Sequence, residues 1–391
     1  MRHNGSARAL GLSTLAMTAS FVIWSVFSPI AGQIQEIFQL STLQKSVLIA
    51  TPILLGSILR IPMGIYTDRY GGKKVFTATM LFLTLPLLLA GWAQSYWMLL
   101  LCALFIGMAG TTFAVSLTYV SRWFTPERQG LILGLAGLGN LGGAVANFSI
   151  PIIFSRYGLS WVFWSLAIMI VVVTLIFWLG TKELPKPAQT KTFKQSMEVL
   201  KQEPTWFLSI FYFLTFGGFV AFSVYLPTFL KELFQLSVTD AGLKTAGFVV
   251  VATLIRPLGG YLADRLGSRK VLAVVFAGIA VCALVMALSL QHFVAFSVGC
   301  LMASVLLGLG NGAVFKMVPE VSTGNTGAVT GIVGAAGGIG GFFPPIVLGI
   351  INDLSGAYTL GFVLLMITAC ACLWMNLATK RLKAAKKVAM A

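Results

Sequence analysis

The stretch LRIPMGIYTDRYGGKK at residues 59–74 returns in altered form as IRPLGGYLADRLGSRK at residues 255–270. Six residues are identical between the two copies, and each lies 196 positions from its match, about half the length of the chain. The repeat predicts two halves of similar architecture that run in the same direction. The matched pairs are Arg60 and Arg256, Gly64 and Gly260, Asp68 and Asp264, Arg69 and Arg265, Gly71 and Gly267, and Lys74 and Lys270.

The composition excludes an ordinary soluble protein. Of the 391 residues, 58% are hydrophobic and 10% are charged, and the mean hydropathy is +0.91. Soluble domains carry about 25% charged residues. Most apolar stretches extend over about 20 residues, the length of helix that crosses roughly 30 Å of hydrocarbon. The first stretch is too long for a cleavable signal and contains Trp24 and Pro29, so we expect it to be a spanning helix.

Hydropathy predicts an all-α membrane protein with twelve transmembrane helices. The longest polar segment contains Pro185, Pro187 and five lysines and predicts a linker outside the bilayer. We therefore expect an N-terminal six-helix bundle at 1–180, a cytoplasmic linker at 181–205 and a C-terminal six-helix bundle at 206–391. The predicted spans are 10–33, 44–66, 75–93, 97–121, 129–153, 160–180, 206–230, 243–263, 271–290, 293–318, 326–350 and 357–379.

The basic residues are distributed unequally between the two sides of the membrane. Of the 27 lysines and arginines, 21 fall on the side of the N-terminus and four on the other, and the remaining two are Arg60 and Arg256. The positive-inside rule then places both termini in the cytoplasm, with the helices in the cell membrane. Because the net charge of +16 comes from short loops and tails, it does not indicate a nucleic-acid partner. The same-direction repeat predicts a transport path between the halves.

No pattern in the sequence indicates an enzyme, a metal site or a cofactor. The five cysteines all fall in apolar spans, and Cys370 and Cys372 do not share a helix face. We find neither a phosphate-binding loop nor a nucleophile with a base. All eleven acidic residues fall in predicted loops or at helix ends, and His3 and His292 fall in the N-terminal tail and a predicted outer turn.

Arg60 and Arg256 are the two charges predicted to lie deep in the membrane. Each lies eight residues before the aspartate of its copy, or about 12 Å along a helix. A charge at this depth costs at least about 2.5 kcal/mol and needs a partner. One such arginine could bond backbone carbonyls, but two at symmetric positions, with no acid nearby, favour a substrate as the counter-charge. Guanidinium groups suit planar oxyanions.

Two predicted helices are crowded with glycine. They contain GLILGLAGLGNLGGAVANF at 130–148 and GAVTGIVGAAGGIGGFF at 327–343. Glycine destabilises a helix interior by about 1 kcal/mol relative to alanine, and in membranes it permits close approach between helices. These segments therefore predict two tight helix contacts.

The two copies of the loop motif resemble the signature between helices 2 and 3 of the major facilitator superfamily. This resemblance implies two six-helix bundles that open alternately to either side of the membrane. Carboxylates and basic residues at the helix ends would then latch the inner side through ion pairs and helix dipoles. The residues expected to gate in this way are Asp68, Arg69, Asp264 and Arg265.

Together, the arginines and the glycine segments resemble the nitrate/nitrite porter family over essentially the whole chain. The resemblance implies that Arg60 and Arg256 bind the anion, that Tyr212 in YFLTFG donates a hydrogen bond to it, and that Phe216 and Phe113 form opposite walls. Further residues follow from the signatures. Asn140 lies in the first glycine segment and matches the asparagine of the family signature there. Other members carry a polar amide near Ala136, and Asn147 is a candidate substitute for it. The expected gating glycines are Gly137, Gly139, Gly337 and Gly338.

The expected function is transport of nitrate and nitrite by a monomer surrounded by membrane lipid. A carrier of another small anion, such as a dicarboxylate or an organic phosphate, is the main alternative, and a sensor that signals through a partner is the other. An empty site with two unpaired guanidinium groups favours nitrate/nitrite exchange, because closing it off from water is unfavourable. Proton-coupled uptake requires a titrating group, for which Lys316 is the candidate.

Overall fold

The chain is mainly helical in the part that its computed structural model describes, residues 5–125, 128–184, 193–321, 326–355 and 358–389. No strand occurs within these ranges. The helices are α1 (Ser6–Trp24), α2 (Ala31–Phe38), α3 (Thr42–Ile58), α4 (Arg60–Tyr70), α5 (Gly72–Gly91), α6 (Tyr96–Ile106), α7 (Thr112–Ser121), α8 (Gln129–Ala136), α9 (Leu141–Gly180), α10 (Phe193–Met197), α11 (Glu203–Phe234), α12 (Val238–Leu254), α13 (Arg256–Leu266), α14 (Ser268–Leu288), α15 (Phe293–Val321), α16 (Thr326–Ser355) and α17 (Thr359–Ala389).

Eleven segments of the described chain are long and apolar enough to cross a membrane. One of them, Gln129–Gly180, has 52 residues, which as a straight helix would measure about 78 Å. It turns at Gly158, where φ is 80° and ψ is 178°, a conformation that only glycine adopts readily. This segment contains the fifth and sixth predicted spans, so the prediction of twelve spanning helices is confirmed.

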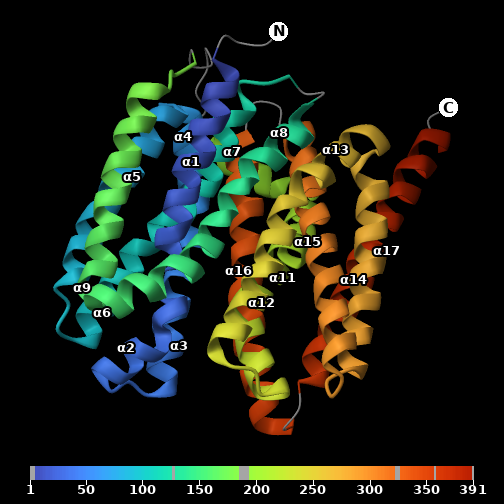
Figure 1. The fold of residues 1–391 in the computed structure, drawn as a ribbon. Coiled ribbons are helices and arrows are strands. Elements are labelled where there is room, and N and C mark those ends of the chain that lie inside the picture. The colour runs from blue at the N-terminus through green and yellow to red at the C-terminus, as the bar shows by residue number, and fades with distance from the viewer. Residues whose placement is uncertain (1–4, 126–127, 185–192, 322–325, 356–357, 390–391) are drawn as a thin grey trace.

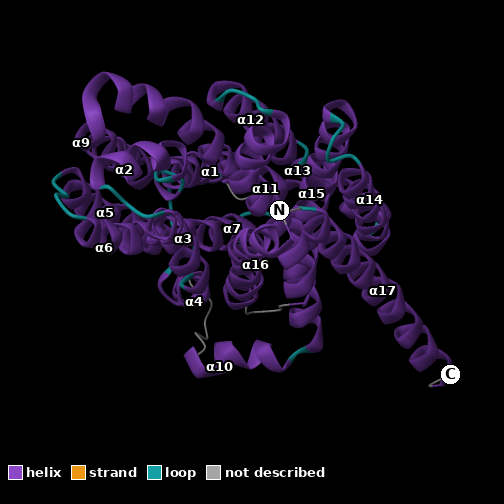
Figure 2. Cartoon of the chain, turned by 90° about the horizontal axis from the view of Figure 1, so that it is seen from below, coloured by secondary structure: helices purple, strands orange, loops and turns teal. Residues whose placement is uncertain are grey.

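The helices lie roughly alongside one another, and α1 begins toward the same end of the molecule at which α17 finishes (Figure 1). Viewed along the helices, α7, α11 and α16 lie near the middle, with α5, α6 and α9 on one side and α14 and α17 on the other (Figure 2). Outward-facing side chains include Leu179 and Leu288, which are 80% and 75% exposed. Such apolar surfaces are typical of helices that face lipid.

The two repeated stretches adopt the same local structure. In the first half, α3 ends at Ile58 and α4 begins at Arg60, and in the second half α12 ends at Leu254 and α13 begins at Arg256. Pro62 and Pro257 follow the arginines closely, and each lacks the N–H group that would continue the hydrogen bonds of the preceding helix. Both arginines therefore lie at the first residue of a new helix, beside a break in the backbone ladder.

The repeated helices also end alike. α4 stops before Gly71 and α13 before Gly267, where φ is 95° and 89°. A side chain at either position would be strained in this region of φ. The matched glycines of the motif thus turn the chain sharply into the next span in each half.

Candidate functional site

Arg60 and Arg256 are fully buried, with exposed fractions of 0% and 1%. Within the described part of the chain, the two ion pairs found both belong to Lys316, and neither guanidinium pairs with a carboxylate. The arginines therefore place two formal positive charges in the interior, as the sequence predicted. Such charges require compensation from hydrogen bonds or from a bound anion.

Arg60 is held by backbone carbonyl groups. Its Nε donates to the Gly110 oxygen at 2.9 Å and its Nη1 to the Gly334 oxygen at 2.7 Å. Gly110 lies in the first half of the chain and Gly334 in the second, so the side chain links the two halves. Its Nη2 finds no hydrogen-bond partner among the described residues.

Arg256 has a looser environment. Its Nη2 donates to the Tyr212 hydroxyl at 3.2 Å, whereas its Nε and Nη1 have no partner within the described ranges. A Cβ added to Gly137 would collide with the Nε of this arginine. The expected gating glycine thus provides the space in which the Arg256 guanidinium lies.

Aromatic rings surround both guanidinium groups. The Cζ of Arg60 lies 4.9 Å from the Phe113 centroid and 5.3 Å from that of Phe216, and the Cζ of Arg256 lies 5.3 Å from Phe113. Tyr212 and Phe216 are stacked, with centroids 5.0 Å apart and planes 7° apart. Residues from four separate parts of the sequence are thus brought together around one point.

The expected slot between Phe113 and Phe216 is narrower than a bound anion requires. The ring centroids lie 5.6 Å apart with a 32° tilt. A planar anion between two rings needs two contacts of about 3.5 Å, or roughly 7 Å. In this conformation the rings contact each other, and they must separate before an anion can lie between them.

Two aromatic residues of the site were missed by the sequence prediction. Phe315 packs on Phe113 at 5.2 Å and on Tyr212 at 4.7 Å between centroids, and it lies 5.7 Å from the Cζ of Arg256. Trp24 lies 5.6 Å from the Cζ of Arg60. Phe315 belongs to the fourth span of the second half, as Phe113 does in the first. The 196-residue offset of the repeat leads from Phe113 to Leu309 rather than to Phe315, and the chain contains 29 phenylalanines, so the shared span was the only signal in the sequence.

Asn140 and Asn147 line a separate cavity of about 70 Å³, together with Trp24 and Ser223 among others. The amide of Asn140 donates to the Gly137 oxygen and that of Asn147 to the Gly143 oxygen, both at 2.9 Å. These donors are thus used within their own helices. The Oδ1 of Asn140 is buried and has no partner in the described part of the chain.

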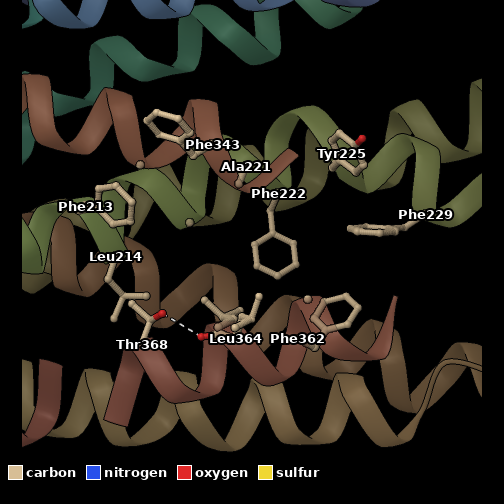
Figure 3. Close-up of a pocket in the computed structure, with 14 residues that line it drawn as sticks. Phe213, Leu214, Ala221, Phe222, Tyr225, Phe229, Phe343, Phe362, Leu364 and Thr368 are labelled. Atoms are coloured by element: carbon tan, nitrogen blue, oxygen red, sulfur yellow. Dashed lines mark hydrogen bonds between the residues drawn. The ribbon is translucent and has the colours of Figure 1, made fainter. Parts of the chain in front are cut away.

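A larger cavity than that of Asn140 and Asn147 lies between α11, α16 and α17 (Figure 3). It has a volume of about 240 Å³, and its walls are mainly aromatic and aliphatic, including Phe222, Phe229 and Phe362. It has no basic residue in its lining. An anion is poorly solvated by such walls, so the arginine cluster is the better candidate site.

The remaining expected gating glycines are all sites of close contact. A Cβ at Gly337 would collide with the Tyr212 ring, and one at Gly338 would collide with Ser57 Oγ. At Gly139 it would lie 2.6 Å from Met17 Cγ. Glycine at these positions lets α16 approach both α11 and α3, which brings the Gly334 carbonyl to Arg60.

The aspartates of the repeated motif contact the opposite half of the molecule. The Oδ2 of Asp68 accepts a hydrogen bond from the Gly327 amide at 2.8 Å, at the start of α16. Asp264 accepts from the Gly130 and Leu131 amides at 3.2 and 3.0 Å, at the start of α8. Carboxylates are favourable at helix N-termini because of the free N–H groups and the helix dipole.

The motif glycines explain how these contacts become possible. A Cβ on Gly64 would collide with the Gly327 carbonyl, and a Cβ on Gly260 would collide with the Gly130 carbonyl. Each aspartate lies one helical turn after such a contact, so its carboxylate reaches the end of the adjoining helix.

The arginines of the motif behave differently from its aspartates. Arg69 and Arg265 are exposed, and their guanidinium groups lie 5.3 Å from the Tyr70 ring and 5.1 Å from the Tyr261 ring of their own helices. The structure thus brings the two expected gating aspartates to the opposite half and leaves the two arginines at the surface.

Known proteins resemble the chain over nearly all of its length. The family described as Major Facilitator Superfamily matches residues 13–343 and 208–389. A probable nitrate transporter, NarT, of Staphylococcus epidermidis is 38% identical over 359 residues, with 92% of each chain covered. The nitrite extrusion protein of Bacillus subtilis is 37% identical, covering 93% of this chain and 91% of its own. A probable nitrate/nitrite transporter, NarK2, of Mycobacterium tuberculosis is also 37% identical, covering 93% and 94%.

Solved structures show the same fold at lower identity. The proton:xylose symporter XylE has a TM-score of 0.81 and 12% identity, covering 96% of this chain and 95% of its own. The human organic anion transporter MFSD10 has a TM-score of 0.78 and 13% identity, covering 95% and 99%. These likenesses show the all-α fold. The family match and the sequence relatives show that the chain is a multi-pass membrane carrier rather than an enzyme. The same family match and relatives show that the chain belongs to the major facilitator superfamily and, within it, to the nitrate/nitrite porter family that its glycine segments resemble.

Proposed function

We propose that this protein exchanges nitrate and nitrite across the cell membrane and that Arg60 and Arg256 bind the transported anion. The observation that carries the proposal is a set of three buried guanidinium nitrogens without partners in the described chain: Nη2 of Arg60 and Nε and Nη1 of Arg256. The names of the relatives support nitrate and nitrite as the anions.

The hydrogen-bond geometry suits an acceptor with several oxygen atoms. The guanidinium groups offer N–H donors and no acceptors. Tyr212 accepts a hydrogen bond from Arg256, so its own hydroxyl hydrogen remains available for an anion oxygen. Nitrate can therefore receive donors from both arginines and from Tyr212 once Phe113 and Phe216 separate.

Alternating access follows from the arrangement of the two bundles, 1–180 and 206–391, joined by the linker 181–205. Asp68 and Asp264 hold the halves together at one end, which we assign to the cytoplasmic side by the positive-inside rule. Both arginines are buried in this conformation. Opening toward the cytoplasm then requires loss of the contacts of both aspartates and separation of the glycine pairs. The two bundles of one chain supply both arginines and the aromatic residues of the proposed site, so a monomer is sufficient as the transport unit.

Exchange follows from the charge of the site. The empty site contains two guanidinium charges, and one bound monovalent anion lowers this to one net charge. The loaded carrier therefore reorients more readily than the empty one. Proton symport would require a titrating group in the path. Lys316, the candidate in the sequence, lies 3.3 Å from the Asp264 and Glu320 carboxylates, which supports a role outside the anion site.

Labelled nitrate uptake into proteoliposomes tests this proposal. Vesicles loaded with nitrite should take up nitrate at a rate that does not respond to an imposed pH gradient, and empty vesicles should take up almost none. Excess unlabelled nitrite should compete, whereas a dicarboxylate or an organic phosphate should not. Strong uptake into empty vesicles driven by external acid would instead establish proton coupling.

A further inference from the structure

Lys316 lies in an ion-paired cluster outside the anion site. Its Nζ is 3.3 Å from Asp264 Oδ1 and 3.3 Å from Glu320 Oε1. The side chains of Lys316 and Asp264 are only 12% and 11% exposed, whereas that of Glu320 is 55% exposed. Removing one partner of a pair that is shielded from water leaves an uncompensated charge, which is more unfavourable than at an exposed pair. Loss of Lys316 should therefore affect Asp264 more than Glu320.

The same Asp264 carboxylate joins the two halves of the protein. It receives the Gly130 and Leu131 amides of α8, which belongs to the first half. Its Oδ1 accepts a hydrogen bond from the Gly130 amide and forms the ion pair with the Lys316 ammonium. Lys316 thus fixes the orientation of this carboxylate and compensates its charge while the halves are in contact.

The residue before Lys316 reaches the anion site. Phe315 contacts the rings of Phe113 and Tyr212 and the guanidinium of Arg256. Successive residues of a helix project about 100° apart. Residues 315 and 316 of α15 therefore face two different regions, and both side chains must shift when this part of the helix moves.

We propose that Lys316 is a positioning residue that couples the anion site to the Asp264 contact, and that it does not carry a proton. The proposal rests on the proposed exchange function. When an anion separates the aromatic rings, Phe315 moves with them. The same displacement of α15 changes the distance from Lys316 to Asp264 and weakens the contact with α8. Occupancy of the site is thereby linked to opening at the cytoplasmic end.

The first experiment compares Lys316→Met with Lys316→Arg in nitrate/nitrite exchange and in equilibrium nitrate binding. The methionine removes the positive charge that compensates the largely shielded Asp264 carboxylate. Exchange should therefore slow by about tenfold or more, while nitrate binding changes by less than about twofold. The arginine keeps the charge and cannot release its proton, so exchange should stay within about threefold of the wild-type rate and remain insensitive to pH gradients. Lys244→Met is a matched control, because Lys244 is exposed and lies over the Phe293 ring; it should exchange normally.

A double-mutant cycle tests whether Lys316 acts through Asp264. Asp264→Asn should slow exchange, and adding Lys316→Met should slow it no further, because the interaction is already lost. Glu320→Gln should have a much weaker effect than Lys316→Met. The proposal is overturned if the two changes multiply, if Lys316→Arg is as slow as Lys316→Met, or if Lys316→Met lowers binding as much as exchange. Absence of exchange in the wild type would defeat the proposed function instead, and a normal rate in Lys316→Met would defeat only this inference.

Discussion

Arg60 and Arg256 occupy matched positions of the repeat, yet the structure gives them different partners. Arg60 donates to carbonyl groups from both halves, at Gly110 and Gly334. Arg256 donates to one phenol, that of Tyr212, in its own half. Of the guanidinium nitrogens without a partner in the described chain, one belongs to Arg60 and two to Arg256.

Matched positions in the repeat therefore do not imply equal roles for the two arginines. An arginine held by backbone carbonyls contributes to the packing of the halves as well as to the charge of the site. An arginine with free donors is better placed to bind the substrate directly. We therefore expect Arg256 to contribute more to anion affinity and Arg60 more to stability, and the following variants test that division.

The largest effect on affinity is expected from Arg256→Lys. Lysine keeps the charge but removes the planar fork. If two charged hydrogen bonds of roughly 1.5 kcal/mol each are lost, nitrate should bind about 100-fold more weakly. Isothermal titration of the purified protein measures this, with thermal unfolding as the control for folding. Near-normal affinity would show that Arg256 is not a ligand.

Arg60→Lys should weaken nitrate binding less, by about tenfold, since one free nitrogen is lost rather than two. It should also lower thermal stability, because one ammonium group replaces the two guanidinium nitrogens that donate to the Gly110 and Gly334 carbonyls. An unpaired buried polar group costs about 1–3 kcal/mol. If both lysine variants lose the same affinity and the same stability, the proposed difference between the arginines is wrong.

Tyr212→Phe should weaken nitrate binding by about fivefold, the equivalent of one hydrogen bond of roughly 1 kcal/mol. The ring is retained, so its stacking on Phe216 should persist and the protein should remain folded. Nitrate binding should also be measured with Tyr212→Phe in the Arg256→Lys background. The two effects should not be additive there, because Tyr212 and Arg256 share a hydrogen bond.

Asp68→Asn should slow exchange by about threefold while nitrate binding changes by less than about twofold. The amide can still accept from Gly327, but the favourable interaction of a charge with the α16 N-terminus is lost, a term of roughly 0.3–1 kcal/mol. The rate of exchange and the equilibrium affinity for nitrate should be measured on the same preparation, which separates an effect on switching from an effect on binding. An equal loss in both would place Asp68 in the binding equilibrium rather than in switching.

The smallest effect is expected from Asn147→Ala. Its amide donates to the Gly143 carbonyl of its own helix, and the side chain is only partly buried. Nitrate affinity should change by less than about twofold. A larger loss, at unchanged thermal stability, would bring Asn147 into the anion path and weaken the assignment of the site to the arginines alone.

Several residues of the candidate site could be predicted because each belongs to a recognisable sequence feature. Arg60 and Arg256 are charges in apolar spans and recur in the repeat, and Tyr212, Phe113 and Phe216 lie in short motifs of a recognisable family. Phe315 has no such motif and was missed, although it contacts both Phe113 and Tyr212. Asn140 and Asn147 were expected at the anion, and the structure directs their amide donors to the backbone of their own helices.

Hydropathy, charge placement and the internal repeat determined the membrane fold, the number of spans and the depth of the arginines, because these properties depend on residue type and spacing along one helix. Partners across helices were decided only by the tertiary structure. The distance between helices determines these partners. It decides which carbonyl accepts from Arg60, whether the Phe113 and Phe216 rings are in contact, and whether Lys316 pairs with Asp264. That distance is set by contacts such as Gly64 with Gly327 and Gly130 with Gly260, between residues far apart in the chain.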